Sequence, residues 1–149
     1  MVVVKNMRRG VPYRWPTHTN ALLIDRKHTR GTEVFLTTIM PGRSTHPHVH
    51  ESNEQLYIAV NGCGEIVFRT GSGARCVRTV TFKKDDVVFI PMHESHQVFC
   101  RGTAPLRYIT VDIFPAGKPA DEPTWAAHAA RLRKETRAAA AGCRRTRGR

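Results

Sequence analysis

Two histidines separated by one residue are the feature of this chain that most directly suggests chemistry. They are His48 and His50, and a third histidine, His96, lies in a later strand-like segment. Side chains alternate between the two faces of a strand, so a His-x-His pair in a strand presents both imidazoles on one face. Neutral imidazoles that converge on one point suit a divalent transition metal. The pattern therefore predicts a metal site, and it requires a sheet that folds back on itself as a barrel or sandwich.

Short strands are the elements that must position these histidines. Turn-forming pairs such as Pro41-Gly42, Asn61-Gly62 and Lys84-Asp85 separate runs of strand-forming residues. Many short strands divided in this way are typical of an antiparallel sandwich or barrel. The expected strands are Ala21–Asp25, Glu33–Ile39, His48–His50, Gln55–Val60, Gly64–Thr70, Arg75–Phe82, Asp86–Ile90, His96–Arg101 and Leu106–Phe114.

The two ends of the chain differ from this β-rich middle. Residues 1–20 are polar, with prolines close to aromatic residues, and we expect an irregular arm that packs over a barrel opening or onto a second subunit. Beyond Pro115, Asp121 is a suitable N-cap, and an apolar stripe with helical spacing follows it. We expect a helix within residues 115–137 that docks on the barrel or on a second subunit through this stripe, which consists of Trp125, His128, Ala129 and Leu132.

The net charge of +12 is concentrated at the C-terminal end. Residues 131–149 hold eight Lys and Arg residues against one acid, Glu135, which gives +7 of the total. We expect residues 138–149 to form a disordered basic tail. The charge therefore indicates a solvated tail and not a folded nucleic-acid surface, and we expect no nucleic-acid function beyond weak attraction by this tail.

Length, hydropathy and cysteine pattern bound the class of protein. A chain of 149 residues, 40% of them hydrophobic, is a single domain by default. No apolar run approaches the ~18 residues of a membrane span, and the short apolar run at the start predicts no signal peptide. The four cysteines show no CxxC spacing, which favours reduced thiols and a cytoplasmic protein.

The spacing of the histidines resembles the two motifs of the cupin superfamily. The first motif runs Gly, five residues, His-x-His, three or four residues, Glu, six residues, Gly, and the second runs Gly, five residues, Pro-x-Gly, two residues, His, three residues, Asn. Here the first reads Gly42-RSTHP-His48-Val49-His50-ESNE-Gln55-LYIAVN-Gly62, with glutamine in the glutamate position. The second reads Asp85-DVVFI-Pro91-Met92-His93-ES-His96-QVF-Cys100, with Asp85 and His93 in place of the glycines and Cys100 in place of the asparagine.

The resemblance implies an all-β fold, the cupin double-stranded β-helix or jelly-roll barrel, over residues 21–114. It assigns one divalent metal to four ligands, His48, His50, Gln55 and His96. Small metal-dependent cupins of the polyketide-cyclase and sugar-uronate types look similar in using a glutamine here.

Two neighbouring residues, Glu54 and Gln55, are alternatives for one ligand position. Glu54 and Gln55 point to opposite faces of a strand, so only one of them can bind the metal. The spacing to Gly62 favours Gln55, whereas the apolar alternation that Glu54 shares with Leu56 and Ile58 favours Glu54. We expect Gln55 to be the ligand.

The neutral ligand set points to Lewis-acid chemistry. An ion held by three imidazoles and an amide keeps its full charge, which favours anionic or enolate ligands. We therefore expect zinc or nickel, with iron or manganese as alternatives. The expected protein is a homodimeric enzyme that isomerises, cyclises or dehydrates a small carbonyl-containing substrate, with His46, His93 or Glu54 moving a proton. The alternatives are an iron-dependent dioxygenase and a non-catalytic cupin that binds a small molecule.

Overall fold

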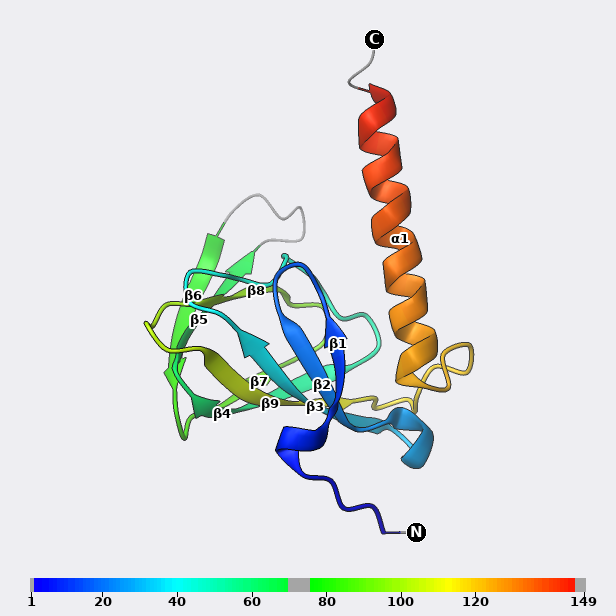
Figure 1. The fold of residues 1–149 in the computed structure, drawn as a ribbon, viewed down its shortest axis with the longest axis horizontal. Helices are drawn as coiled ribbons and strands as arrows, with labels where there is room; N and C mark the ends of the chain where they lie inside the picture. Colours follow the sequence, from blue (N-terminus) through cyan, green and yellow to red (C-terminus); the bar gives the residue numbers. More distant parts are fainter. Residues whose placement is uncertain (1, 70–75, 147–149) are drawn as a thin grey trace.

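The structure is a computed structural model that describes residues 2–69 and 76–146, of which residues 76–77 and 136–146 are described through their backbone alone. Figure 1 shows a β-barrel with one helix, α1, standing along its side and projecting beyond it. The elements in chain order are η1 (Met7–Arg9), β1 (Val11–Arg14), β2 (Thr19–Ile24), η2 (Arg26–His28), β3 (Thr32–Ile39), β4 (Glu54–Asn61), β5 (Cys63–Arg69), β6 (Cys76–Lys83), β7 (Val87–Ile90), β8 (Ser95–Cys100), β9 (Leu106–Ile113) and α1 (Trp125–Thr146).

Two antiparallel sheets form the barrel. The larger has the strand order β1-β2-β3-β9-β4-β7, and the smaller has the order β6-β5-β8. The segment between β3 and β4 runs beside β8 and extends the smaller sheet. Its Thr45 N–H donates to the Val98 carbonyl at 2.9 Å, and His48 and His96 exchange both backbone hydrogen bonds at 3.0 and 2.9 Å. This is the jelly-roll arrangement that the sequence predicts, and it places the His-x-His segment beside the strand that carries the third histidine.

The barrel interior changes character from one end to the other. The apolar end is filled by side chains that are nearly or fully buried, among them Ile39, Ile66, Ile90, Val98 and Leu106. Strand β9 shows the change, because its inward positions alternate strictly and run from Leu106 and Tyr108 to Thr110 and Asp112. A buried polar group needs a hydrogen-bond partner. The polar end of the barrel is therefore where a built site is expected, and the histidines lie there.

Helix α1 docks on the barrel near this polar end. Its residues Trp125 and Ala129 are buried in one cluster with Leu22 and Phe35. The Trp125 and Phe35 ring centroids lie 4.5 Å apart. The predicted docking of the helix stripe on the barrel is thus confirmed.

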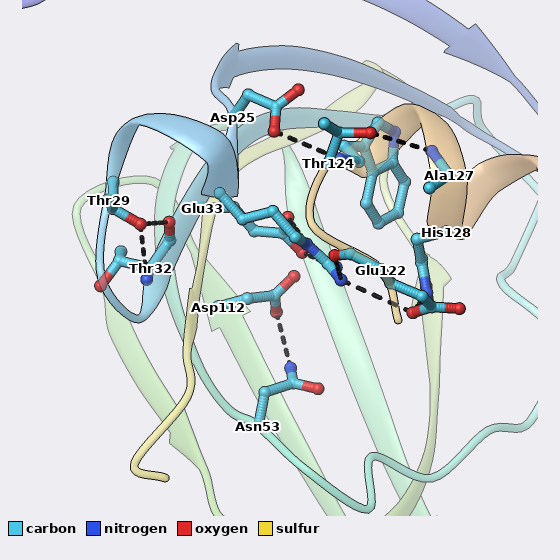
Figure 2. Close-up of polar contacts among 12 residues, drawn as sticks. Asp25, Thr29, Thr32, Glu33, Asn53, Asp112, Glu122, Thr124, Ala127 and His128 are labelled. Carbon is cyan, nitrogen blue, oxygen red and sulfur yellow. Dashed lines mark hydrogen bonds and ion pairs between the residues drawn. The ribbon is translucent and has the colours of Figure 1, made fainter. Parts of the chain in front are cut away.

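The start of α1 differs from the prediction. The helix begins at Trp125, and the Thr124 hydroxyl accepts the Ala127 N–H at 3.2 Å. Asp25, directly after β2, also accepts the Trp125 N–H at 3.2 Å (Figure 2). Asp121 is therefore not the N-cap, because Thr124 stands directly before the first helical residue and a long-range carboxylate satisfies a second exposed N–H.

Three further expectations need correction. Residues 1–20, expected to be irregular, contain β1, which pairs with β2 in a hairpin. The expected strand His48–His50 is reduced to a single bridge between His48 and His96. Helix α1 continues to Thr146, so residues 138–146 are helical where we expect a disordered tail, because alanine and arginine have high helix propensity. Residues 147–149 of that tail lie outside the described residues.

Within the described part of the chain, no helix has both the length and the apolar character needed to cross a membrane.

Candidate metal centre

Three histidine side chains meet at the polar end of the barrel. Ring nitrogens of His48, His50 and His96 all lie within 4.8 Å of one another. The rings of His48 and His96 have centroids 4.4 Å apart. Backbone pairing creates this cluster, since His48 bridges to His96 and the His93 N–H donates to the His50 carbonyl at 2.9 Å. The predicted convergence of the three imidazoles is present.

Backbone carbonyls fix the tautomers of two of these rings. His48 Nδ1 lies 2.8 Å from the His46 carbonyl oxygen, and His96 Nδ1 lies 2.8 Å from that of Glu94. A carbonyl oxygen only accepts, so each Nδ1 carries the proton and each Nε2 keeps a lone pair. His50 Nε2 is buried and has no hydrogen-bond partner. Two imidazole lone pairs, together with the unpartnered ring nitrogen of His50, fit a divalent transition metal.

Burial also keeps these rings neutral. It lowers the pKa of His50 to about 3, with the neighbouring His48 and His96 acting in the same direction. It lowers the pKa of His96 to about 4, again with a contribution from His48, and it lowers the pKa of His48 as well. Only the unprotonated imidazole can bind a metal. The cluster is therefore ready to bind metal throughout the neutral range.

The lowered pKa of His50 predicts a loss of stability in acid. Between pH 6.5 and about 3 the unfolded chain binds a proton that the folded chain does not, so the free energy of unfolding falls as the pH is lowered. We expect metal-free wild type to lose on the order of 2 kcal/mol more than the His50→Gln variant between pH 6.5 and 4.5. Urea unfolding of both proteins in the presence of a chelator measures this difference. Equal losses in the two proteins would show that His50 is not held neutral by burial.

The side chain of Gln55 reaches towards the same cluster. Its Nε2 donates to Asp112 Oδ1 at 2.7 Å, and its Oε1 accepts from the Tyr57 hydroxyl at 2.7 Å. That hydroxyl also lies 3.3 Å from His96 Nε2. The amide oxygen of Gln55 is thus one hydroxyl group away from the histidines. Burial raises the pKa of Tyr57 well above its usual value, so this hydroxyl stays protonated and acts as a donor.

The structure places the other expected site residues further from the metal cluster. His46 is exposed and lines the cavity beside it. His93 is exposed, and its Nδ1 lies 2.9 Å from the Glu51 carboxylate. Glu54 lies on the outward face of β4, opposite to Gln55, and is not among the residues that line the cavity in the described part of the chain.

A cavity of about 810 Å³ lies beside the histidines. The inward face of the larger sheet, the loop between β1 and β2, and the first turns of α1 contribute to its walls. Trp15, Phe35 and Tyr57 give it aromatic surfaces, while Thr37 and Thr110 add hydroxyl groups whose oxygens are 2.8 Å apart. The volume and the mixture of apolar walls with a few polar groups are those of a small-molecule site.

Two residues at this site were not predicted from the sequence. His18, in the loop between β1 and β2, lines the cavity, and burial together with His48 and His46 lowers its pKa to about 4. Asp112 lies in β9 as the cross-strand neighbour of Gln55. The alternation of β9 was a signal for Asp112, because this residue continues its inward series. No local pattern marks His18.

A chain of buried charges leads from Asp112 to α1, and most of its members are drawn in Figure 2. Arg26 donates to both carboxylate oxygens of Glu33 at 2.6 Å, and its Nη1 lies 3.6 Å from Glu122 Oε2. Glu122 in turn lies 2.6 Å from His128 Nδ1 on α1. Burial, reinforced by the Glu33 carboxylate, raises the pKa of Asp112 to about 8. One arginine thus faces a buried pair of acids that together retain a proton at neutral pH.

Comparisons with known proteins agree with this fold. A family model described as the cupin domain matches residues 35–112. Solved structures also match the chain. A predicted oxalate decarboxylase from Thermotoga maritima is 22% identical over 75% of this chain and 99% of its own, with a TM-score of 0.64. The oxalate decarboxylase of Lactobacillus farciminis in complex with formate is 25% identical over 74% of this chain and 32% of its own, with a TM-score of 0.62.

A third match is a structure of Bacillus subtilis oxalate decarboxylase concerned with its Mn(II) centres. It is 19% identical over 70% of this chain and 29% of its own, with a TM-score of 0.59. The chain therefore spans about a third of the Lactobacillus and Bacillus enzymes. No curated protein sequence matches the chain.

Proposed function

We propose that this chain, which belongs to the cupin family, is a metal-dependent enzyme that acts on a small molecule bearing a carbonyl or enolate oxygen. The observation that carries the proposal is the convergence of His48, His50 and His96 beside a cavity of small-molecule size. Gln55 is the proposed fourth ligand, through Oε1. Four neutral donors favour zinc or nickel over a metal that must reach a higher oxidation state, with manganese and iron as alternatives.

The residues around the cavity divide the proposed work between binding and proton transfer. A divalent metal at this site supplies a Lewis acid that polarises a substrate oxygen. Tyr57 keeps its proton and donates a hydrogen bond beside that position. Trp15 and Phe35 offer apolar surface to a planar substrate and exclude water. His18 and His46 line the same cavity, and we assign proton transfer to them because an imidazole can accept and return a proton. The lowered pKa of His18 keeps its ring unprotonated, so that it can act as the base.

Hydrogen exchange next to a carbonyl group tests this proposal directly. The zinc- or nickel-loaded protein is incubated in D2O with a panel of small keto acids and β-diketones, and loss of the adjacent C–H signal is followed by proton NMR. We expect metal-dependent exchange that falls by roughly 10²-fold in a His18→Gln/His46→Gln double variant. Absence of exchange with the whole panel would contradict the proposal.

Three further assays distinguish the alternative functions. Oxygen consumption by iron-loaded protein supports a dioxygenase. Formate release from oxalate by manganese-loaded protein supports the reaction for which the matched structures are named. Saturable binding of a panel compound without any turnover supports a binding protein.

We also propose that two copies of the chain associate through the outward face of the larger sheet. Strand register places two apolar rows across this face, Val34–Val111–Leu56–Phe89 and Leu36–Ile109–Ile58–Val87. Val87 and Phe89 are 62% and 53% exposed, and both lie in the edge strand β7. Exposed apolar patches of this kind mark interaction sites. Neither row carries a charge, so the same face of a second copy can cover it without burying one.

A charge placed in this face is expected to prevent the association. Phe89→Glu should convert a dimer to a monomer at micromolar concentration, because dimerisation would bury the new carboxylate without a partner. Sedimentation equilibrium measures the mass. Ala130→Glu, at an exposed position of α1, is the matched control and should remain dimeric. A monomeric wild type, or a dimeric Phe89→Glu, would contradict this interface.

A further inference from the structure

Three polar side chains lie side by side on the inward face of the larger sheet. Glu33 in β3, Asp112 in β9 and Gln55 in β4 are cross-strand neighbours in one row. Their exposed fractions are 0%, 6% and 6%. The proposed reaction uses Gln55 and gives Asp112 no role. A buried acid is costly unless its hydrogen bonds serve the structure around it.

The hydrogen bonds of Asp112 converge on the proposed ligand Gln55 and on Asn53. Its Oδ1 accepts from Gln55 Nε2 at 2.7 Å and from Asn53 Nδ2 at 3.0 Å. The second of these bonds is drawn in Figure 2. Asn53 lies three residues after His50 in the segment that leads into β4, and the buried Nε2 of His50 has no hydrogen-bond partner.

We propose that Asp112 is the positioning residue of the metal centre. It holds the amide of Gln55 by its nitrogen, so that the oxygen is left for the metal. Its hydrogen bond with Asn53 ties the segment that carries His50 to β9. This inference rests on the ligand set of the proposed function and deepens it.

The contact between Asp112 and residue 55 explains why residue 55 is a glutamine. An amide can donate to Asp112 with one atom and offer an oxygen with the other, whereas a glutamate would set a second acceptor-only group against the Asp112 carboxylate. Asp112 also has a fixed neighbour on the other side, because Glu33, its cross-strand partner, is paired with Arg26. Restraint on both sides is what a residue that fixes ligand direction requires.

Cobalt binding to Asp112 variants tests this role, with Co²⁺ alone as the probe. Asp112→Leu removes the acceptor and is expected to weaken Co²⁺ binding by roughly 10–100-fold and to change the visible d–d spectrum of the bound ion. Asp112→Asn keeps an oxygen for Gln55 and Asn53 and can donate to Glu33, so it should retain most of the affinity and the wild-type spectrum. Ile66→Val, in the apolar end of the barrel, is the control for lost stability and should leave both readouts unchanged.

Each outcome decides the inference. Wild-type affinity in Asp112→Leu, or an equal loss in Asp112→Asn, would overturn it. If Asp112→Leu does not fold, Asn53→Ala decides, because that variant releases only the segment that carries His50: severalfold weaker Co²⁺ binding supports the inference, and unchanged binding overturns it. A wild type that binds no Co²⁺ would instead contradict the proposed function, so the two failures are distinguishable.

Discussion

The His96→Ala variant is expected to bind divalent metal more weakly than wild type by roughly 100-fold or more, beyond the effect of losing an outer partner. His96 is 0% exposed, and its Nδ1 is bound to the Glu94 carbonyl. Its Nε2 lone pair is thus directed into the cluster, and alanine offers no donor atom in its place. Competition with a chromophoric zinc chelator measures the affinity over this range.

His93→Ala is the matched control for this experiment. His93 lies three residues earlier, is exposed, and contacts Glu51 instead of the cluster. We expect its metal affinity to equal that of wild type. Equal losses in the two variants would mean that His93 is a ligand, and an unchanged His96→Ala would remove His96 from the site.

The largest expected effect on stability comes from Arg26. Its side chain is 2% exposed, donates to both oxygens of Glu33, and lies 4.9 Å from the centre of the Phe114 ring. Arg26→Met keeps most of the apolar packing but leaves Glu33 and Glu122 without their common cation. Breaking a buried ion pair in this way costs about 3–5 kcal/mol. We expect that loss in the free energy of unfolding, measured in urea at neutral pH.

Arg131→Met separates this effect from a general loss of charge. Arg131 also contacts Glu122, but its side chain is 47% exposed. Exposed ion pairs contribute about 0–1 kcal/mol, so this variant should be close to wild type. Comparable losses in the two variants would show that the buried position of Arg26 does not determine its contribution.

Motif spacing accounts for why the barrel and the histidine cluster could be predicted. The positions of His48, His50 and His96 depend on strand pairing, which the turns and alternation already specify. Asp85 and His93, which replace the glycines of the second motif, have φ of 75° and 65°. The backbone therefore keeps the left-handed conformation that glycine adopts at less cost. The spacing remained informative because Asp85 and His93 adopt the left-handed backbone although neither is a glycine.

The choice between Glu54 and Gln55 depends on which face of β4 is buried. Motif spacing favoured Gln55, which does face inward, whereas the apolar alternation favoured the outward face. Gln55 and Tyr57 point inward, whereas Leu56 and Ile58 point outward. An apolar outward face produces the same alternation of residues in the sequence as a buried core face. If a second copy covers the outward face, its apolar residues are buried in the dimer in the same way as core residues. Alternation alone then cannot tell the outward face of β4 from the inward one.

Long-range polar contacts could not be predicted from the sequence, for a different reason. Arg26, Glu33 and Glu122 meet only because η2, β3 and the segment before α1 converge on one side of the barrel. His18 reaches the cavity because β1 pairs with β2. No local periodicity records such contacts, since each depends on how separate elements pack.

Native mass spectrometry of the folded protein, equilibrated with zinc, tests the central claim most directly. We expect one zinc ion per wild-type chain and none in a His48→Ala/His50→Ala double variant whose circular dichroism matches wild type. A folded wild-type chain that binds no zinc, nickel, manganese or iron, or a double variant that still binds one ion, would contradict the account.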